Sequence, residues 1–240
     1  MSKRQITRLI TAVAVSLLPF NWMRCAAYRL VFKYNIRRSF IGIGTVIVVK
    51  EATLDQCWIG KFNRFLGPMS VTIGGKTTIG PANEFICGFW TLDSEFKNAS
   101  YRRQLQIGDG VVITCRHYFD LAGSLTIGDK SWIAGRGSQF WTHGAGIEER
   151  DITIGEDCYV GSGVRFAPGA AVPDYCIVGL GSVVTRKIAE SRTLVGGVPA
   201  KIIKRDYDWK AALEEKASAS TSNEMIHEGG RQLAEGAACI

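Results

Sequence analysis

The amino-acid sequence predicts an all-β fold, a parallel β-helix of hexapeptide repeats, and three observations support this prediction. An aliphatic or aromatic residue opens every sixth position from Ile154 to Val184. A small residue or proline follows the opener in each full unit of that stretch. Hydrophobic residues make up 46% of the 240 residues, which is enough for a substantial core. Because one six-residue unit cannot bury its opener alone, three units are expected to form a triangular coil and the coils to stack.

Each element of the repeat has a predicted place in the coil. The openers should point to the centre of the triangle: Ile154, Val160, Phe166, Val172, Val178 and Val184. The fifth position of each unit should turn inward near a corner, where small residues fit: Cys158, Val164, Ala170, Cys176 and Ser182. Earlier units begin at Ile73, Ile79, Ile107 and Ile127. The alternative is a sandwich of short strands with glycine-rich turns, which the strict phase of five consecutive units disfavours.

The chain is expected to divide into three parts. Residues 1–38 form a basic amphipathic helical segment, residues 39–206 the β-helix domain, and residues 207–240 a polar tail with a short helix and a disordered end. Within the domain, residues 39–72 have poor repeat phase and predict an irregular first part. Stretches without repeats at 91–106 and 142–151 predict loops that project from corners of the coil, where function is often found.

Positive charge is concentrated near the N-terminus. Residues 1–50 contain nine lysines and arginines and no acidic residue, whereas the whole chain has a net charge of +7. The apolar run 9–18 is too short to span a bilayer as a helix. Two alternatives remain for residues 1–20: a helix on the inner surface of a membrane, or a helix that caps the open end of the coil. Nucleic acid is not an expected partner, because no aromatic and basic recognition motif accompanies the charge.

Cysteine and histidine content narrows the chemistry. The seven cysteines show no disulfide framework or metal-binding spacing, so a reducing compartment, the cytoplasm, and no metal site are expected. Of the three histidines, His143 lies where the hexapeptide repeat is interrupted and the second predicted loop, 142–151, begins. Neutral imidazole is the usual general base near pH 7, so His143 is the candidate catalytic residue. His117 is either a corner histidine bonded to the backbone or a substrate contact, and Glu148 or Glu149 is a candidate to orient His143.

The C-terminal half resembles a known family of enzymes. The run WTHG, a short loop, and then the repeats that end in GGVPAK are similar to the hexapeptide-repeat acyltransferases. Bacterial sugar and polysaccharide O-acetyltransferases are the most similar branch. The resemblance covers roughly residues 107–205 and, more weakly, 41–106. It implies a left-handed coil, a homotrimer with each active site between two neighbouring β-helices, and acetyl-coenzyme A as the acyl donor.

The resemblance also implies roles for particular residues. His143 corresponds to the histidine that deprotonates an acceptor hydroxyl. The residues implied for coenzyme A binding are Tyr159, Ser162, Gly181, Ser182, Arg186, Val198, Pro199, Ala200 and Lys201, with Lys187, Lys204 and Arg205 as further candidates for the phosphates. Trp90 and Trp141 are candidates to stack on a sugar face, or else pack in the core.

The predicted function is O-acetyl transfer from acetyl-coenzyme A to a hydroxyl of a sugar or polysaccharide precursor. Gly144 departs from the proline that often follows the catalytic histidine in relatives, and the loop after it is short, so the acceptor is not identified. A γ-class carbonic anhydrase would need three zinc-binding histidines, which His117 and His143 do not supply. The alternative from another class is a non-enzymatic β-helix that serves as a scaffold or assembly subunit.

Overall fold

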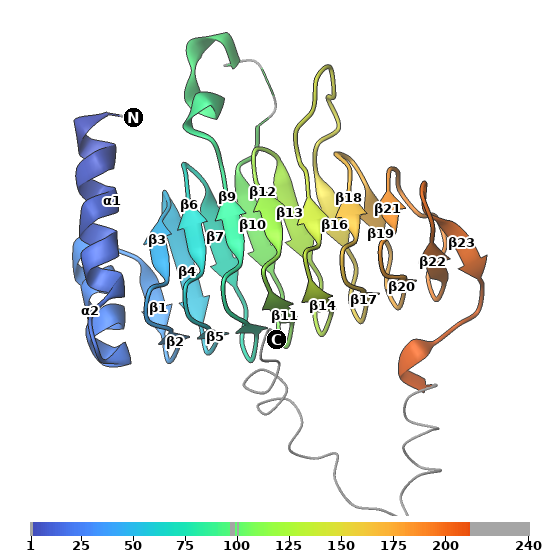
Figure 1. Cartoon of the computed structure of the whole chain (residues 1–240), viewed down its shortest axis with the longest axis horizontal. Coiled ribbons are helices and arrows are strands. Elements are labelled where there is room, and N and C mark those ends of the chain that lie inside the picture. Colours follow the sequence, from blue (N-terminus) through green and yellow to red (C-terminus); the bar gives the residue numbers. More distant parts are fainter. Residues whose placement is uncertain (1, 97–98, 100, 212–240) are drawn as a thin grey trace, which may run out of the picture.

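The protein is a left-handed parallel β-helix preceded by two helices, as a computed structural model shows (Figure 1). The structure describes residues 2–96, 99 and 101–211. Short strands follow one another around a triangular coil, and successive coils stack from the helices to the last strand pair (Figure 1). The fold class predicted from the hexapeptide beat is therefore confirmed.

Three sheets form the sides of the triangle, and all neighbouring strands are parallel except the last pair of sheet B. Sheet A contains β1 (Asn35–Arg37), β4 (Glu51–Asp55), β7 (Ser70–Ile73), β10 (Gln104–Ile107), β13 (Ser124–Ile127), β16 (Ile152–Ile154) and β19 (Ala171–Val172). Sheet B contains β2 (Phe40–Ile41), β5 (Trp58–Ile59), β8 (Thr78–Ile79), β11 (Val112–Cys115), β14 (Trp132–Arg136), β17 (Tyr159–Val160), β20 (Ile177–Val178), β22 (Leu194–Gly196) and β23 (Lys201–Lys204). Sheet C contains β3 (Val46–Val48), β6 (Arg64–Leu66), β9 (Glu84–Ile86), β12 (Tyr118–Asp120), β15 (Gln139–Phe140), β18 (Arg165–Phe166) and β21 (Val183–Val184).

The openers of the repeat form the core, as predicted. All six from Ile154 to Val184 are at most 1% exposed, and so are the five small residues at the fifth positions. On the inner side of sheet C the openers are aromatic in five successive coils, and neighbouring rings stack at centroid distances of 4.4, 4.4, 4.6 and 4.9 Å. This ladder consists of Phe65, Phe85, Phe119, Phe140 and Phe166. Parallel stacking follows from the in-register pairing of the strands that carry the rings.

The first coils are regular, which corrects the predicted irregular part at 39–72. Strand β1 begins at Asn35 and pairs in register with β4, so the β-helix starts before residue 39. The poor phase of this region accompanies strands of unequal length, from two to five residues. Strand β4 spans five residues, and its side chains alternate between exposed and buried, so side-chain alternation continues beyond the usual two-residue strand.

The N-terminal segment is a hairpin of two helices that caps the first coil. Helices α1 (Lys3–Ser16) and α2 (Asn21–Phe32) pack on each other and on β1, β2 and β3. From α2 the buried Tyr28 hydroxyl accepts a hydrogen bond from the Ile47 amide and donates to the Thr45 carbonyl. The capping role that the sequence left open is thus confirmed. Within the described residues, neither helix is long and apolar enough to cross a membrane.

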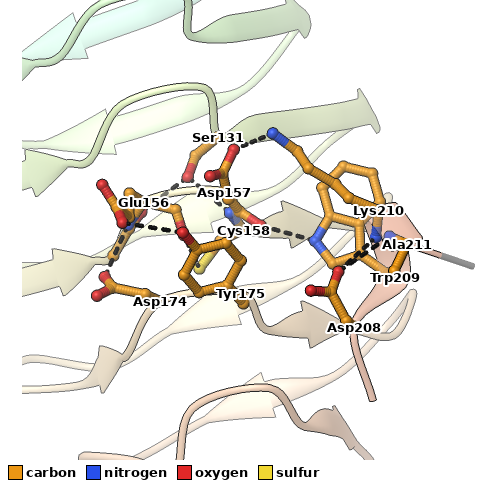
Figure 2. Close-up of polar contacts among 11 residues, drawn as sticks. Ser131, Glu156, Asp157, Cys158, Asp174, Tyr175, Asp208, Trp209, Lys210 and Ala211 are labelled. Atoms are coloured by element: carbon orange, nitrogen blue, oxygen red, sulfur yellow. Dashed lines mark hydrogen bonds and ion pairs between the residues drawn. The ribbon is translucent and has the colours of Figure 1, made fainter. Parts of the chain in front are cut away.

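The C-terminal segment folds back along the coil (Figure 1). After β23 antiparallel to β22, the chain reaches the turn between sheets A and B, where the Trp209 indole N–H donates to the Asp157 carbonyl at 2.6 Å. Figure 2 shows Lys210 beside it, paired with the Asp157 carboxylate. The tail predicted for 207–240 is described only to residue 211, and its remainder, including His227, lies outside the described residues.

The aromatic ladder gives a stability test. Phe85→Ala removes a fully buried ring between two stacked neighbours, so the free energy of unfolding should fall by about 3–5 kcal/mol. Leu92→Ala, at a side chain that is 56% exposed, is the control and should change it by less than about 0.5 kcal/mol. Urea unfolding followed by circular dichroism measures both. An equal effect of the two substitutions would contradict the role of the ladder.

Candidate active site at the edge between sheets C and A

Three successive turns from sheet C to sheet A form the candidate site, and we call this corner of the coil the C–A edge. The first insertion follows β9 and the second follows β15, so both project from this edge (Figure 1). Strand β12 lies between β9 and β15 in sheet C and ends at Asp120. The coil therefore brings Asp120 to the place where the two insertions begin.

His143 and Asp120 form a hydrogen-bonded pair. The distance from His143 Nδ1 to Asp120 Oδ2 is 2.8 Å, and the Thr142 amide and hydroxyl donate to the same oxygen at 2.9 and 2.8 Å. Because a carboxylate oxygen that receives other donors acts as an acceptor, we assign the imidazole proton to Nδ1. Nε2 then carries a lone pair, and it has no hydrogen-bond partner in the part of the chain that the structure describes.

Burial separates the two members of the pair. The Asp120 side chain is 6% exposed, whereas that of His143 is 39% exposed. A buried carboxylate holds the ring in one orientation, and the free nitrogen is open to a substrate. This arrangement, a base oriented by a buried acid, is the one that general-base catalysis requires.

Two tryptophans flank the His143 ring. The centroid of Trp90, in the 3₁₀ turn η1 (Phe89–Leu92), lies 5.4 Å from the imidazole, and that of Trp141 lies 6.4 Å away. Trp90 is fixed by edge contacts with Phe96, in η2 (Ser94–Phe96), and with Tyr101, each at 5.2 Å. Both tryptophans predicted for substrate binding thus lie beside the predicted base.

Contacts between the two insertions hold this geometry. The Arg150 guanidinium lies over the Tyr101 ring at 4.7 Å, and Arg102 pairs with Asp151 at 2.8 Å. Gly123 permits the close approach, because a Cβ there would meet Arg150 Cβ at 2.9 Å. Its amide donates to the Thr142 hydroxyl at 2.9 Å, which positions the residue before His143.

The structure corrects the predicted partner of His143. Glu149 pairs instead with Lys187 at 3.0 Å, and Glu148 is exposed in the loop. Asp120 was missed because it belongs to the preceding coil, 23 residues earlier, and the hexapeptide beat slips in that coil. An acidic residue that directly follows a phenylalanine opener was the signal that could have found it.

His117 is a structural residue and not a substrate contact. It is 1% exposed, its Nδ1 accepts from the Ser138 amide at 3.1 Å, and its Nε2 lies 3.0 Å from the Thr114 hydroxyl. Below it, Asn83 and Asn63 occupy equivalent places in a buried polar ladder, in which each side chain bonds the next coil. Burial lowers the pKa of His117 to about 4.

The residues predicted to bind coenzyme A occupy different parts of the coil. Ser162 and Gly181 lie at the corner between sheets B and C, which we call the B–C edge, in a row of open glycines. At Gly137, Gly163 and Gly181 the backbone is left-handed, and an added Cβ would meet nothing within 4 Å. The Ser182 side chain is not part of this open surface, because it is 1% exposed and donates to the Gly179 carbonyl.

Tyr159 is also separate from the basic residues predicted with it. It lies on the outer side of sheet B, where its ring is 6.3 Å from that of Trp132 and 5.7 Å from that of Trp209. Its ring therefore packs against the C-terminal segment of its own chain, which weakens the prediction that it contacts coenzyme A.

The predicted phosphate-binding residues do come together. A groove of about 470 Å³ at the last coil is lined by Arg186, Lys187, Ala200, Lys201, Ile202 and Arg205, among others. Lys187 and Arg205 have acidic partners, Glu149 and Glu190. Arg186 and Lys201 have no acidic partner within the described residues, so their charges remain available. Val198 and Pro199 are exposed next to Ala200, which is buried.

A second groove connects this basic region with the site. It has a volume of about 680 Å³, and its lining combines residues 146–149 of the second insertion with Thr185, Arg186 and Lys187. Arg186 lines both grooves. The C–A edge thus carries a path from the cationic end of the coil to the loop that begins at His143, whereas the glycine row lies on the other side of sheet C. Among the described residues, no three histidine, cysteine or acidic side chains lie where they could hold a metal ion.

His117 predicts a pH dependence of stability. Its folded pKa, about 4, lies below the ordinary value of 6.5, so the unfolded state binds the proton first as pH falls. The free energy of unfolding should therefore drop between pH 6.5 and pH 4, by on the order of 3 kcal/mol from this residue. His117→Asn, which copies the asparagines of the ladder, should remove this part. Urea unfolding at several pH values compares the two proteins, and superimposable pH profiles would contradict the assignment.

Comparisons with known proteins find similarity to acetyltransferases. No protein-family model matches the chain. It is 39% identical over 71 residues, 30% of its length, to a protein of Escherichia coli K12 named for lipopolysaccharide biosynthesis O-acetyl transfer, WbbJ. It is 37% identical over 57 residues, 24% of its length, to the galactoside O-acetyltransferase of the same organism. These matches span 35% and 28% of the relatives, so the chain covers about a third of their length.

A solved structure, the polysialic-acid-specific acetyltransferase NeuO, aligns with 78% of the chain and 92% of its own at 21% identity and a TM-score of 0.47. The hexapeptide coil and the sequence matches together confirm that this chain resembles the hexapeptide-repeat acyltransferase family.

Proposed function

We propose that the protein is an acetyl-coenzyme A-dependent O-acetyltransferase that modifies a hydroxyl of a sugar or polysaccharide precursor. The observation that carries the proposal is the pairing of His143 with the buried Asp120, which leaves Nε2 without a protein partner among the described residues, with Trp90 and Trp141 near the ring. The names of two curated relatives, which are O-acetyltransferases, support the same reaction class.

The reaction needs one base and good positioning. His143 Nε2 would remove the acceptor hydroxyl proton while the oxygen attacks the thioester carbonyl carbon. The tetrahedral intermediate would then expel the coenzyme A sulfur, and the imidazolium would donate the proton to that leaving thiolate. Asp120 would stabilise that imidazolium through Nδ1, because its carboxylate lies 2.8 Å away. No covalent enzyme intermediate is required.

The donor would lie along the grooves of the C–A edge. Arg186 and Lys201 line the groove and have no acidic partner among the described residues. They would bind phosphates of the nucleotide through charge-assisted hydrogen bonds. The segment Val198–Ala200 lies beside this groove and would contact the same part of the donor. The path past Arg186 would bring the thioester end toward His143.

The acceptor would meet the two tryptophans. A sugar ring presents an apolar face that stacks on aromatic side chains, and Trp141 is 36% exposed beside the base. The hydroxyl to be acetylated would then point at Nε2.

A homotrimer belongs to the proposal. One chain leaves its open glycine row, with Ser162 and Gly181, on the B–C edge, while His143 lies on the C–A edge. A neighbouring β-helix would supply its glycine row as the second wall of the site, as in the enzymes that this chain resembles. The cytoplasm, predicted from the cysteine spacing, is the proposed compartment.

Activity of three variants tests the base and its partner. We expect His143→Ala to lower kcat by roughly 100-fold or more, with little change in KM for acetyl-coenzyme A. Asp120→Asn should lower kcat by about 100-fold or more, because the amide no longer fixes the imidazole proton on Nδ1. Glu51→Gln, an acid with a 69% exposed side chain on β4 and away from both grooves, is the control and should stay within about twofold of wild type.

Release of coenzyme A in the presence of a panel of sugars and glycan precursors measures these rates. Full activity of His143→Ala would overturn the proposed base. If wild type neither turns over nor binds coenzyme A, the scaffold function replaces this proposal.

Calorimetric binding of coenzyme A tests the basic groove. The double variant Arg186→Gln, Lys201→Gln should bind coenzyme A about 10- to 100-fold more weakly, because two charge-assisted contacts with phosphate are lost. Lys130→Gln, an exposed cation on the corner between sheets A and B, should bind as wild type does. Pantetheine, which lacks the nucleotide, should not distinguish the variants. Unchanged affinity of the double variant would place the phosphates elsewhere.

A further inference from the structure

The outer surface of the helical cap is apolar. The side of α1 that carries Ala12 and Val15 is buried against the coil. On the opposite side four residues spaced at i, i+4, i+7 and i+11 share one helical face. These four are exposed: Ile6 (47%), Ile10 (65%), Val13 (42%) and Leu17 (59%). The structure therefore shows that α1 caps the coil with one face and leaves an apolar face uncovered.

The second helix also carries exposed apolar side chains. Helix α2 buries Cys25, Tyr28 and Phe32 toward the coil. Exposed apolar residues remain on it and just before it: Phe20 (60%), Trp22 (69%), Leu30 (70%) and Val31 (57%). Both helices cover the same end of the coil (Figure 1). We call the exposed apolar residues of α1 and α2, with Phe20, the outer cap surface.

The charged side chains of the cap itself are all cations. No acidic residue occurs in 1–50. Arg8 and Arg29 donate to backbone carbonyls of Val49 and Ile36, so they help to fasten the cap. Lys3, Arg4, Lys33 and Arg37 are exposed and have no partner within the described residues, so their charge faces solvent.

We propose that the outer cap surface docks on the anionic surface of a lipid bilayer. Apolar side chains flanked by lysine and arginine, with a tryptophan among them, are suited to the boundary between headgroups and acyl chains. A second copy of this surface is a poorer occupant. A symmetric contact would place the same unpaired cations against each other.

The place of the cap in the fold is compatible with catalysis. The cap covers the first coil, and the basic groove with Arg186 and Lys201 lies at the last one. A bilayer on the cap would therefore not block the groove. The inference does not depend on acetyl transfer, because it rests only on the cap.

Sedimentation with lipid vesicles tests the inference on the full chain. We expect wild type to bind phosphatidylcholine vesicles that contain phosphatidylglycerol, and to bind pure phosphatidylcholine vesicles much more weakly. Ile10→Asp with Leu17→Asp should weaken binding about tenfold or more, since both side chains belong to the apolar face. Ile203→Asp, on β23 at the other end of the coil and 66% exposed, is the matched control and should bind as wild type does.

A second variant separates a docking role from a folding defect. Lys33→Gln with Arg37→Gln changes only exposed charge and should also weaken binding to the anionic vesicles, with an unchanged melting temperature. Wild type that binds the anionic vesicles no better than the neutral ones would overturn the proposal, and so would undiminished binding by both double variants. Concentration-dependent self-association that Ile10→Asp with Leu17→Asp abolishes, without vesicle binding, would assign the surface to a second copy instead.

Discussion

The central apolar column is the constraint on which the rest of this structure depends. Each parallel strand contributes at least one buried side chain, and no coil is stable without the coils above and below it. The ladder from Phe65 to Phe166 shows how strictly this holds, since five rings stack in register with centroids 4.4–4.9 Å apart. Register in the column in turn fixes the register of every corner. Side chains from separate coils, such as Asp120 and His143, therefore meet at a reproducible distance.

The column has an open end at the first coil, and its corners contain buried backbone polar groups. Local segments of the chain cover the end and bond the polar groups. The open end of the first coil is covered by α1 and α2, whose buried faces replace a missing coil. At the B–C edge the backbone polar groups are satisfied by the ladder of Asn63, Asn83 and His117. An unsatisfied buried polar group would cost about 1–3 kcal/mol, so the ladder residues are chosen for bonding capacity more than for volume. Burial lowers the pKa of His117 to about 4, so its imidazole is neutral at pH 7.

The proposed chemistry uses the corner of the coil from which both insertions project. A β-helix without insertions offers flat sides and narrow turns. The two insertions at the C–A edge provide the aromatic walls, and the coil between them provides the buried carboxylate. Rigid coils hold the acid, and a loop fixed by Thr142 and Arg150 holds the base. The buried Asp120 is therefore held in place by the coil, whereas the more exposed His143 is accessible to a substrate.

The sequence by itself determined the β-helix and its core, and it indicated the proposed base, because a six-residue period and a histidine at the break of that period are local patterns. The sequence also identified residues 1–38 as a positively charged helical segment. It did not show that this segment is a hairpin of two helices, with one face of α1 packed on the coil and another face exposed. The partner of His143, the structural role of His117, and the separation of Tyr159 from Arg186 were decided only by the tertiary structure. Each depends on which residues of different coils become neighbours, and one irregular coil shifts that alignment. The six-residue period therefore predicts which side chains point into the core. The stacking of the coils decides which side chains become neighbours at the corners.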